Sequence, residues 1–210
     1  MCFPPKASKI FDNNLKCIVE FKATDEKVGE SFGTAEFLSD DGILITNAHV
    51  ATYSSLGIIK TFENYFIRFS NEDIYRKVIL IKYDLTIDIA VLKFNDTDYK
   101  YKPIKLGDST IISHGDKVYA IGNAMNHGLS ITQGIISIPS INIEYQQKTR
   151  NVIQCDITIT EGSSGGALLD KFGRLIGITT FRTKDNHGTI IYGIAYAVPV
   201  NIILEFVDVS

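Results

Sequence analysis

Short strand-like segments separated by turn residues run along nearly the whole chain, and this pattern constrains the fold more than any other feature. Most segments are rich in Ile, Val, Tyr and Phe, which favour strands, and Gly, Asn or Asp stand between them. The segments lie at residues 17–23, 34–39, 43–46, 65–70, 75–83, 89–94, 117–123, 129–137, 151–159, 174–181 and 193–199. Short strands at this spacing predict an all-β chain that folds as a sandwich or a barrel.

A polar run at residues 95–100 interrupts this pattern and divides the chain into two halves of similar length. We expect residues 1–100 and 101–210 to form two β-barrel halves of one domain. A length of 210 residues suits one large domain or two small units that share an interface. The stretch at residues 200–208 predicts a short closing helix, with Asn201 as its candidate cap.

The composition argues against several classes of partner. A net charge of −3 is too small to indicate a nucleic-acid partner, and no run approaches the 18 apolar residues of a membrane span. The N-terminus lacks the apolar segment of a signal peptide. Cys2, Cys17 and Cys155 are too few and too widely spaced for a disulfide framework. We therefore expect free, unreactive thiols and a reducing, cytoplasmic location.

Neither a metal nor another cofactor is expected. His114, His127 and His187 lie in polar, glycine-containing loops, and no two of them have the spacing of metal ligands. We expect these histidines to be solvated. Residues 123–128 and 182–188 are predicted only as loops.

A glycine-rich turn around a serine, EGSSGG at residues 161–166, indicates nucleophilic chemistry. Glycine allows positive φ and the close approach of a substrate, so this turn suits an exposed hydroxyl. Serine is a weak nucleophile and needs a base and a group that orients the base. His49 in TNAHV and Asp88 in DIAVLKF supply both, and the chain order His, Asp, Ser is known for acyl-transfer triads. We expect Ser164, which directly precedes two glycines, to meet them in a cleft between the halves.

The proposed roles follow from acyl-transfer chemistry. Ser164 would attack a peptide carbonyl, and His49 would accept the serine proton and later give it to the leaving amine. Asp88 would hold the tautomer of the imidazole. The N–H groups of Gly162 and Ser164 would bind the oxyanion if the turn is tight. Taken singly, each residue also has an ordinary structural explanation, and only the combination points to catalysis.

Several segments together resemble the peptidase domain of HtrA/Deg-type serine peptidases, in the same order and over about residues 30–200. They are GTAEFLSDDGILITNAHV, DIAVLKF, VYAIGNAMNHGLSITQGIIS, GSSGGALLDKFGRLIGI and GIAYAVPV. The resemblance implies a trypsin-like (chymotrypsin-type) fold, all-β with two barrels and a short C-terminal helix. It implies a triad of His49, Asp88 and Ser164 that acts on polypeptides. Gly162 and Ser164 would form the oxyanion hole. Related peptidases often form trimers, which leaves a homo-oligomer open here.

The resemblance also implies which residues contact the substrate. Thr179, Thr180 and Phe181 should offer an edge strand to the substrate backbone. Thr158, six residues before the nucleophile, should form the floor of the primary pocket, and Ile194 should narrow it. Because Thr158 is not Asp, we expect no preference for Lys or Arg. A small or medium aliphatic residue before the scissile bond is the prediction, with loose selectivity.

The chain departs from the family at Ser163, where HtrA proteins usually have Asn and cleavage-activated relatives of the wider fold have Asp. Without a carboxylate there, activation by a new N-terminus is not expected. We also expect no PDZ-like domain after Ser164. Two function classes stay open. One is an active serine endopeptidase that acts on unfolded or flexible polypeptide. The other is a latent or inactive module that binds peptides in the cleft, with its oxyanion turn misformed until a partner orders it.

Overall fold

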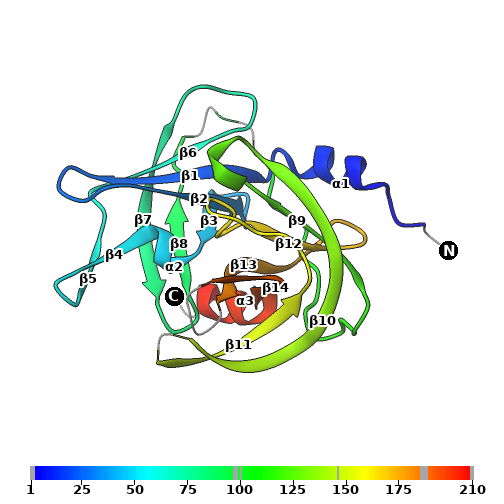
Figure 1. The fold of residues 1–210 in the computed structure, drawn as a ribbon. Coiled ribbons are helices and arrows are strands. Elements are labelled where there is room, and N and C mark those ends of the chain that lie inside the picture. Colours follow the sequence, from blue (N-terminus) through cyan, green and yellow to red (C-terminus); the bar gives the residue numbers. More distant parts are fainter. Residues whose placement is uncertain (1–2, 97–98, 100, 146, 185–188, 209–210) are drawn as a thin grey trace.

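The computed structural model describes residues 3–96, 99, 101–145, 147–184 and 189–208. Within these residues the chain forms two closed, antiparallel six-stranded barrels that lie side by side (Figure 1). One short helix follows the last strand. The all-β, two-barrel fold with a C-terminal helix that the sequence predicts is confirmed, whereas the domain boundary near residue 100 stays a prediction.

The first barrel closes in the strand order β1-β2-β3-β8-β7-β6. Its strands are β1 (Ile18–Asp25), β2 (Gly29–Phe37), β3 (Ile43–Thr46), β6 (Asn64–Arg68), β7 (Arg76–Asp84) and β8 (Ile89–Lys93). Aromatic side chains fill much of its interior, where the rings of Phe37 and Phe69 stack with centroids 5.8 Å apart. Strands rich in Phe, Ile and Val form this barrel because their alternate side chains all find buried neighbours.

The second barrel closes in the strand order β10-β11-β14-β13-β12-β9. Its strands are β9 (Lys117–Gly122), β10 (Ser130–Tyr145), β11 (Lys148–Cys155), β12 (Ala167–Asp170), β13 (Leu175–Lys184) and β14 (Ile190–Pro199). Strand β10 runs well past the predicted end at residue 137 and curves around the barrel (Figure 1). Register shifts between Ile136 and Ile141 allow β10 to continue through Pro139, which cannot donate a ladder hydrogen bond.

A separate hydrophobic cluster joins the two barrels. Its buried members come from both barrels and from the terminal helices α1 (Ala7–Asn14) and α3 (Val200–Asp208), and they include Ile10, Ile18, Ile45, Ile89, Tyr119, Ile121, Ala167, Ile178 and Ile203. Because neither barrel covers this surface alone, the cluster fixes how the barrels sit against each other. This contact therefore positions the candidate site residues of one barrel against those of the other.

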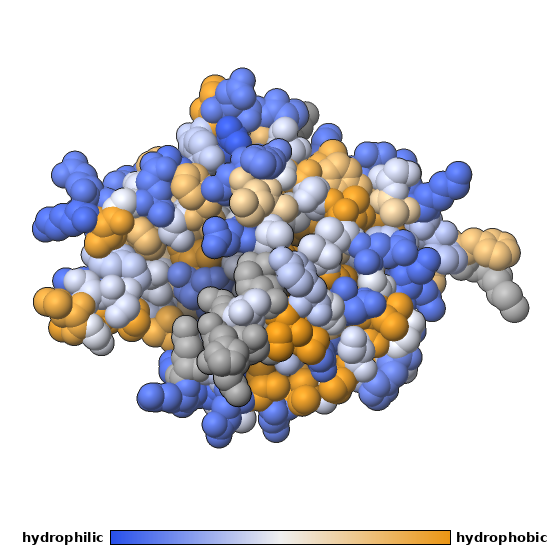
Figure 2. Space-filling model, viewed as in Figure 1, coloured by the Kyte–Doolittle hydropathy of each residue, from blue (hydrophilic) through white to orange (hydrophobic). Residues whose placement is uncertain are grey.

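Several elements escape the sequence pattern. These are α1, α2 (Ala48–Ala51), the 3₁₀ turn η1 (Ala124–Asn126), strand β12, and the hairpin of β4 (Thr52–Ser55) and β5 (Ile58–Thr61). The hairpin projects from the body, and Figure 2 shows hydrophobic surface at its tip. Leu56 is fully exposed there, and Ile58 is 62% exposed. An exposed apolar hairpin has no buried face, so no alternation marks it in the sequence.

Helix α3 forms as predicted, but the assignment of Asn201 as its cap is wrong. The helix begins at Val200, and Asn201 lies inside it. The Asn201 Oδ1 accepts hydrogen bonds from the Ser109 N–H at 2.9 Å and the Ser109 hydroxyl at 2.6 Å, so it ties the helix to the segment before β9. None of the described helices has the length and apolarity that a membrane crossing requires.

Candidate active site

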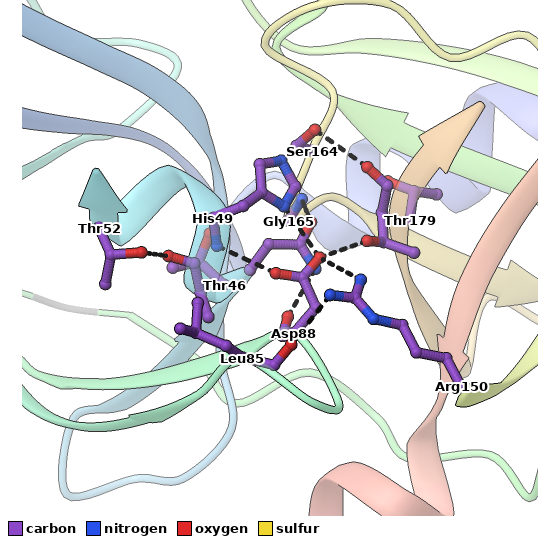
Figure 3. Close-up of polar contacts among 12 residues, drawn as sticks. Thr46, His49, Thr52, Leu85, Asp88, Arg150, Ser164, Gly165 and Thr179 are labelled. Carbon is purple, nitrogen blue, oxygen red and sulfur yellow. Dashed lines mark hydrogen bonds and ion pairs between the residues drawn. The ribbon is translucent and has the colours of Figure 1, made fainter. Parts of the chain in front are cut away.

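The candidate catalytic residues come from three segments that the fold brings together (Figure 3). His49 lies in α2, the short helix after β3, and Asp88 lies directly before β8. Ser164 lies in the turn between β11 and β12. Asp88 has a φ of 62°, a left-handed conformation that is uncommon outside glycine. Its hydrogen-bond partners therefore have to hold it in this conformation.

The Asp88 carboxylate orients His49 through two hydrogen bonds. Its Oδ2 lies 2.8 Å from His49 Nδ1, and its Oδ1 accepts from the His49 backbone N–H at 3.0 Å. This contact places the ring proton on Nδ1 and leaves Nε2 as the basic nitrogen. The His49 side chain is 43% exposed while that of Asp88 is 2% exposed, so the imidazole spans from the buried carboxylate to the solvent.

Two further side chains contact the same carboxylate. The Thr180 hydroxyl donates to Asp88 Oδ2, and Arg150 Nη1 lies 3.5 Å from that oxygen. Arg150 is itself buried, and its Nη2 donates to the Leu85 carbonyl at 2.9 Å. Burial raises the pKa of the Asp88 carboxyl, but His49 and the other partners outweigh burial, and the pKa lies below its ordinary value. Asp88 is therefore ionised at neutral pH.

The Ser164 hydroxyl points away from the base in this structure. Its Oγ donates to the Thr180 carbonyl at 3.2 Å, and no hydrogen bond joins it to His49 within the described residues. Figure 3 draws this hydrogen bond as the dashed line that begins at Ser164. Nucleophile and base are often poorly aligned without substrate and tighten when it binds.

The turn before Ser164 has the geometry of a type II β-turn. The Ser163 N–H donates to the Thr160 carbonyl at 3.0 Å, and Gly162, the third residue of this turn, has a φ of 84°. A positive φ at the third position distinguishes type II from type I, and the two types differ by a flip of the central peptide. That central peptide joins Glu161 to Gly162, and its orientation decides where the Gly162 N–H points.

The Glu161 carbonyl is held on one side of the turn, where the Met125 N–H donates to it at 2.7 Å. In a trans peptide the N–H points opposite to the C=O, so the Gly162 N–H points to the other side. Within the part of the chain that the structure describes, the N–H groups of Gly162 and Ser164 donate to no protein acceptor. Both donors are available for an oxyanion, and the turn is not in the flipped form.

Residues of the first barrel form hydrogen bonds to the serine turn of the second barrel. The Thr34 hydroxyl donates to the Gly162 carbonyl at 2.9 Å. The Asn47 amide bridges both sides of the site, because its Nδ2 donates to the Asp88 carbonyl at 3.0 Å and its Oδ1 accepts from the Gly165 N–H at 2.7 Å. Sequence reasoning missed both residues, although Asn47 stands inside the TNAHV motif beside the candidate base.

Thr179 and Thr180 form hydrogen bonds to the serine turn and to Asp88. The Thr179 N–H donates to the Gly166 carbonyl at 2.8 Å, and the Thr179 carbonyl accepts from the Gly165 N–H at 2.9 Å. Thr179 is 1% exposed, so its backbone holds the turn and does not face a substrate strand, contrary to the expectation. Thr180 supplies its hydroxyl to Asp88.

A cavity of about 50 Å³ lies beside the turn, where the primary pocket is expected. Thr158, Ser163 and Thr179 are among its lining residues, but the described residues that line it do not include Ile194. The role of Ile194 in narrowing the primary pocket therefore stays a prediction. Phe181 lies outside the cavity too, where its ring stacks on Tyr145 with centroids 4.0 Å apart.

Among the described residues, the other cysteines and histidines have no arrangement that indicates a second reactive centre. Cys17 and Cys155 are free and buried, and burial raises their thiol pKa values to about 11 and about 12. Such thiols stay protonated and poorly nucleophilic at neutral pH. Within the described residues no group of three or more His, Cys, Asp and Glu has the geometry of a metal site. The expectations for Cys2 and His187 lie outside the described residues.

Comparison with known proteins agrees with this fold. Residues 33–178 match the family described as trypsin-like peptidase domain. The serine endoprotease DegS of Haemophilus influenzae is 32% identical over 179 residues, which cover 85% of this chain and 49% of DegS. A probable periplasmic DegP-like serine endoprotease of Buchnera aphidicola is 35% identical over 168 residues, which cover 79% of this chain and 33% of that protein. The chain thus spans about half the length, or less, of these curated relatives.

A solved structure shows the same architecture. The HtrA-type protease AlgW with a tripeptide superposes with a TM-score of 0.79 at 29% identity, covering 96% of this chain and 62% of AlgW. These matches confirm the resemblance that the sequence motifs carry. The chain belongs to the trypsin-like peptidase domain family, and its relatives include the HtrA-type serine endoproteases.

Proposed function

We propose that this chain is a serine endopeptidase that hydrolyses polypeptides through an acyl-enzyme. The observation that carries the proposal is the combination of an ionised, buried Asp88 bound to His49 with a serine turn that presents two unpaired N–H donors. Family membership supports the same activity, because the similar proteins are named as serine endoproteases.

The first half of the mechanism forms the acyl-enzyme. Ser164 Oγ attacks the carbonyl carbon of the scissile peptide while His49 Nε2 accepts the hydroxyl proton. The negative charge that develops on the carbonyl oxygen is stabilised by the N–H groups of Gly162 and Ser164. The C–N bond then breaks, and His49 gives the proton to the leaving amine. Asp88 stabilises the imidazolium throughout but does not take its proton.

The second half returns the enzyme to its starting state. A water molecule gives its proton to His49 and attacks the ester carbonyl of the acyl-enzyme. The second tetrahedral intermediate collapses, the serine oxygen regains the proton from His49, and the carboxylic acid product leaves. Before the first step, a rotation about the Ser164 Cα–Cβ bond has to move Oγ from the Thr180 carbonyl towards the imidazole.

A small cavity beside the turn supports the proposed substrate preference. At about 50 Å³ the cavity admits a short apolar side chain and little more. Thr158 supplies no carboxylate there, so a Lys or Arg side chain would lack a counter-charge. We propose a small or medium aliphatic residue before the scissile bond. Discrimination between neighbouring aliphatic residues should be loose, at about 1–3 kcal/mol per methylene.

The second candidate is a latent or inactive module that holds peptides in the cleft. The hydrogen bond from Ser164 to the Thr180 carbonyl favours it, because this hydroxyl is not engaged with the base. The type II turn favours the active enzyme, because a latent form with a misformed oxyanion turn would have the Glu161–Gly162 peptide flipped.

Location and assembly are proposals as well. We propose a cytoplasmic location because the two described cysteines are free and buried. The Buchnera relative is named as periplasmic, so cell fractionation has to decide between the two compartments. A homotrimer is the assembly to test, by sedimentation of the purified chain.

Hydrolysis of a denatured protein by matched variants tests the activity. Ser164→Ala should lower the rate at least about 10³-fold, because the nucleophile is lost. Ser163→Ala is the comparison variant. It removes a hydroxyl that lines the cavity beside the turn but leaves the nucleophile, so it should lower the rate far less than Ser164→Ala does. Equal loss in both variants, or no hydrolysis by the folded parent chain, would reject the endopeptidase and leave the binding module.

A further inference from the structure

A buried carboxylate on the first barrel accepts a hydrogen bond from a loop of the second barrel. Glu20 lies on β1 with 3% of its surface exposed. Its Oε2 accepts one hydrogen bond from Arg68 Nη2 at 2.7 Å and another from Asn123 Nδ2 at 3.0 Å. Arg68 stands directly opposite Glu20 in the pairing of β1 with β6, whereas Asn123 follows β9 of the other barrel. The Glu20–Arg68 ion pair therefore also binds Asn123, a residue outside the sheet that carries the pair.

The backbone N–H and the side-chain amide nitrogen of Asn123 both donate hydrogen bonds, and its side-chain oxygen accepts one. It is 1% exposed, its Oδ1 accepts from the Gly128 N–H at 2.9 Å, and its backbone N–H donates to the Thr34 hydroxyl at 2.9 Å. Its backbone carbonyl packs against Gly162, where an added Cβ would come within 2.2 Å of the carbonyl oxygen. The loop and the oxyanion turn thus lie in direct contact, with no room for a side chain between them.

From Asn123 the contacts lead to both carbonyls that flank the Gly162 φ angle. The Thr34 hydroxyl, which accepts from the Asn123 N–H, donates to the Gly162 carbonyl at 2.9 Å. Met125, two residues after Asn123, donates its N–H to the Glu161 carbonyl at 2.7 Å. A flip of the Glu161–Gly162 peptide would break the Met125 hydrogen bond and turn the Gly162 N–H out of the cleft.

We propose that Glu20 and Arg68 are positioning residues that hold the oxyanion turn in its active orientation through Asn123. This inference rests on the proposed function. A hydrogen bond from an amide to a carboxylate is charge-assisted and stronger than one to a neutral acceptor. Arg68 pairs with Glu20 at 2.7 Å and holds the carboxylate in place beside the loop, and its own guanidinium lies 5.0 Å from the centre of the Tyr75 ring. Neither residue lines the cavity beside the turn, so both would act through the loop.

Two variants should lower turnover without weakening substrate binding. Glu20→Gln removes the charge and keeps the shape, and Arg68→Gln removes the partner charge. Removing an oxyanion donor costs about 10²–10³ in rate, and a loosened turn should cost less, about 10–100-fold in kcat. KM should stay within about 2-fold. Arg68→Lys should recover most of the kcat because it retains the positive charge.

The matched control is Glu30→Gln. Glu30 lies on the neighbouring strand β2 and pairs with Lys22, and its side chain is 47% exposed. Within the described residues no hydrogen bond or ion pair joins Glu30 to the loop, and the variant should keep the parent kcat. A kcat for Glu20→Gln within about 2-fold of the parent value would overturn the proposal.

Hydrogen exchange at the Met125 amide tests the positioning role independently of activity. The Met125 N–H reports the Glu161 contact, and Glu20→Gln should speed its exchange at least about 10-fold, while amides at the centre of β6 keep their rates. Unchanged exchange at Met125, or equal acceleration in β6, would overturn the proposal, because the ion pair would then stabilise only its sheet. If the parent chain hydrolyses nothing, the proposed function fails, and the exchange result still decides whether Glu20 holds the turn.

Discussion

At the scale of single residues, Arg150 places a positive charge beside the carboxylate that orients His49. Its side chain is 5% exposed, and it contacts Asp88 and the Leu85 carbonyl from the opposite barrel. The guanidinium also lies 5.2 Å from the ring centre of Tyr145. Because Arg150 links β11 to the segment that carries Asp88, it stabilises the cleft as well as the ionised carboxylate.

Replacement of Arg150 should therefore destabilise the fold. Arg150→Met keeps most of the volume but removes the permanent positive charge beside Asp88, and it should lower the free energy of unfolding by about 1.5–3 kcal/mol. Urea unfolding measures this. Arg174→Met is the control, because Arg174 pairs with Asp170 at a site where its own side chain is 45% exposed, and it should change stability little. Equal stability of the two variants would contradict the role assigned to Arg150.

At the scale of elements, strand β2 carries two buried polar residues on one face. Thr34 fastens the oxyanion turn, and Glu36, two residues further along the same face, is fully buried with no hydrogen-bond partner among the described residues. The cross-strand partners of Glu36 are Ile18 and Ile45, and both belong to the cluster between the barrels. Burial raises the pKa of the Glu36 carboxyl well above its ordinary value of 4.5.

Glu36 should make the fold less stable as the pH rises. In the unfolded chain the carboxyl loses its proton near pH 4.5, whereas in the folded chain it keeps the proton to higher pH. Above the unfolded value the unfolded state therefore binds fewer protons, and stability falls by up to about 1.4 kcal/mol per pH unit until the folded pKa is passed. Glu36→Gln should remove this slope. Urea unfolding between pH 5 and 8 measures it, and parallel profiles for parent and variant would contradict the prediction.

The elements also show what the sequence can and cannot predict. Strands with a buried face, such as β1 and β8, follow from their apolar residues, whereas β5 is exposed along its whole length and carries no such pattern. The sequence identifies His49, Asp88 and Ser164 because each stands in a recognisable motif and acyl transfer needs all three residue types. Glu20 and Asn123 were missed as partners, because a contact between residues so far apart in the chain depends on how the two barrels pack.

At the scale of the whole molecule, the two barrels contribute different parts of one site. The first barrel supplies His49 and Asp88, and the second supplies Ser164 and the oxyanion turn. The hydrophobic cluster between the barrels and the hydrogen bonds of Asn47 hold these parts in position relative to each other. If this geometry is that of an active enzyme, Ser164 should be a stronger nucleophile than any other serine in the chain.

Mass spectrometry of the folded chain after treatment with a fluorophosphonate tests this claim most directly. The account predicts one adduct per chain, located on Ser164, and none in His49→Ala at the same probe concentration, because the base is needed to activate the hydroxyl. Ser163→Ala should still be labelled on Ser164. An unlabelled parent chain that is demonstrably folded, or an adduct on a different serine, would contradict the account.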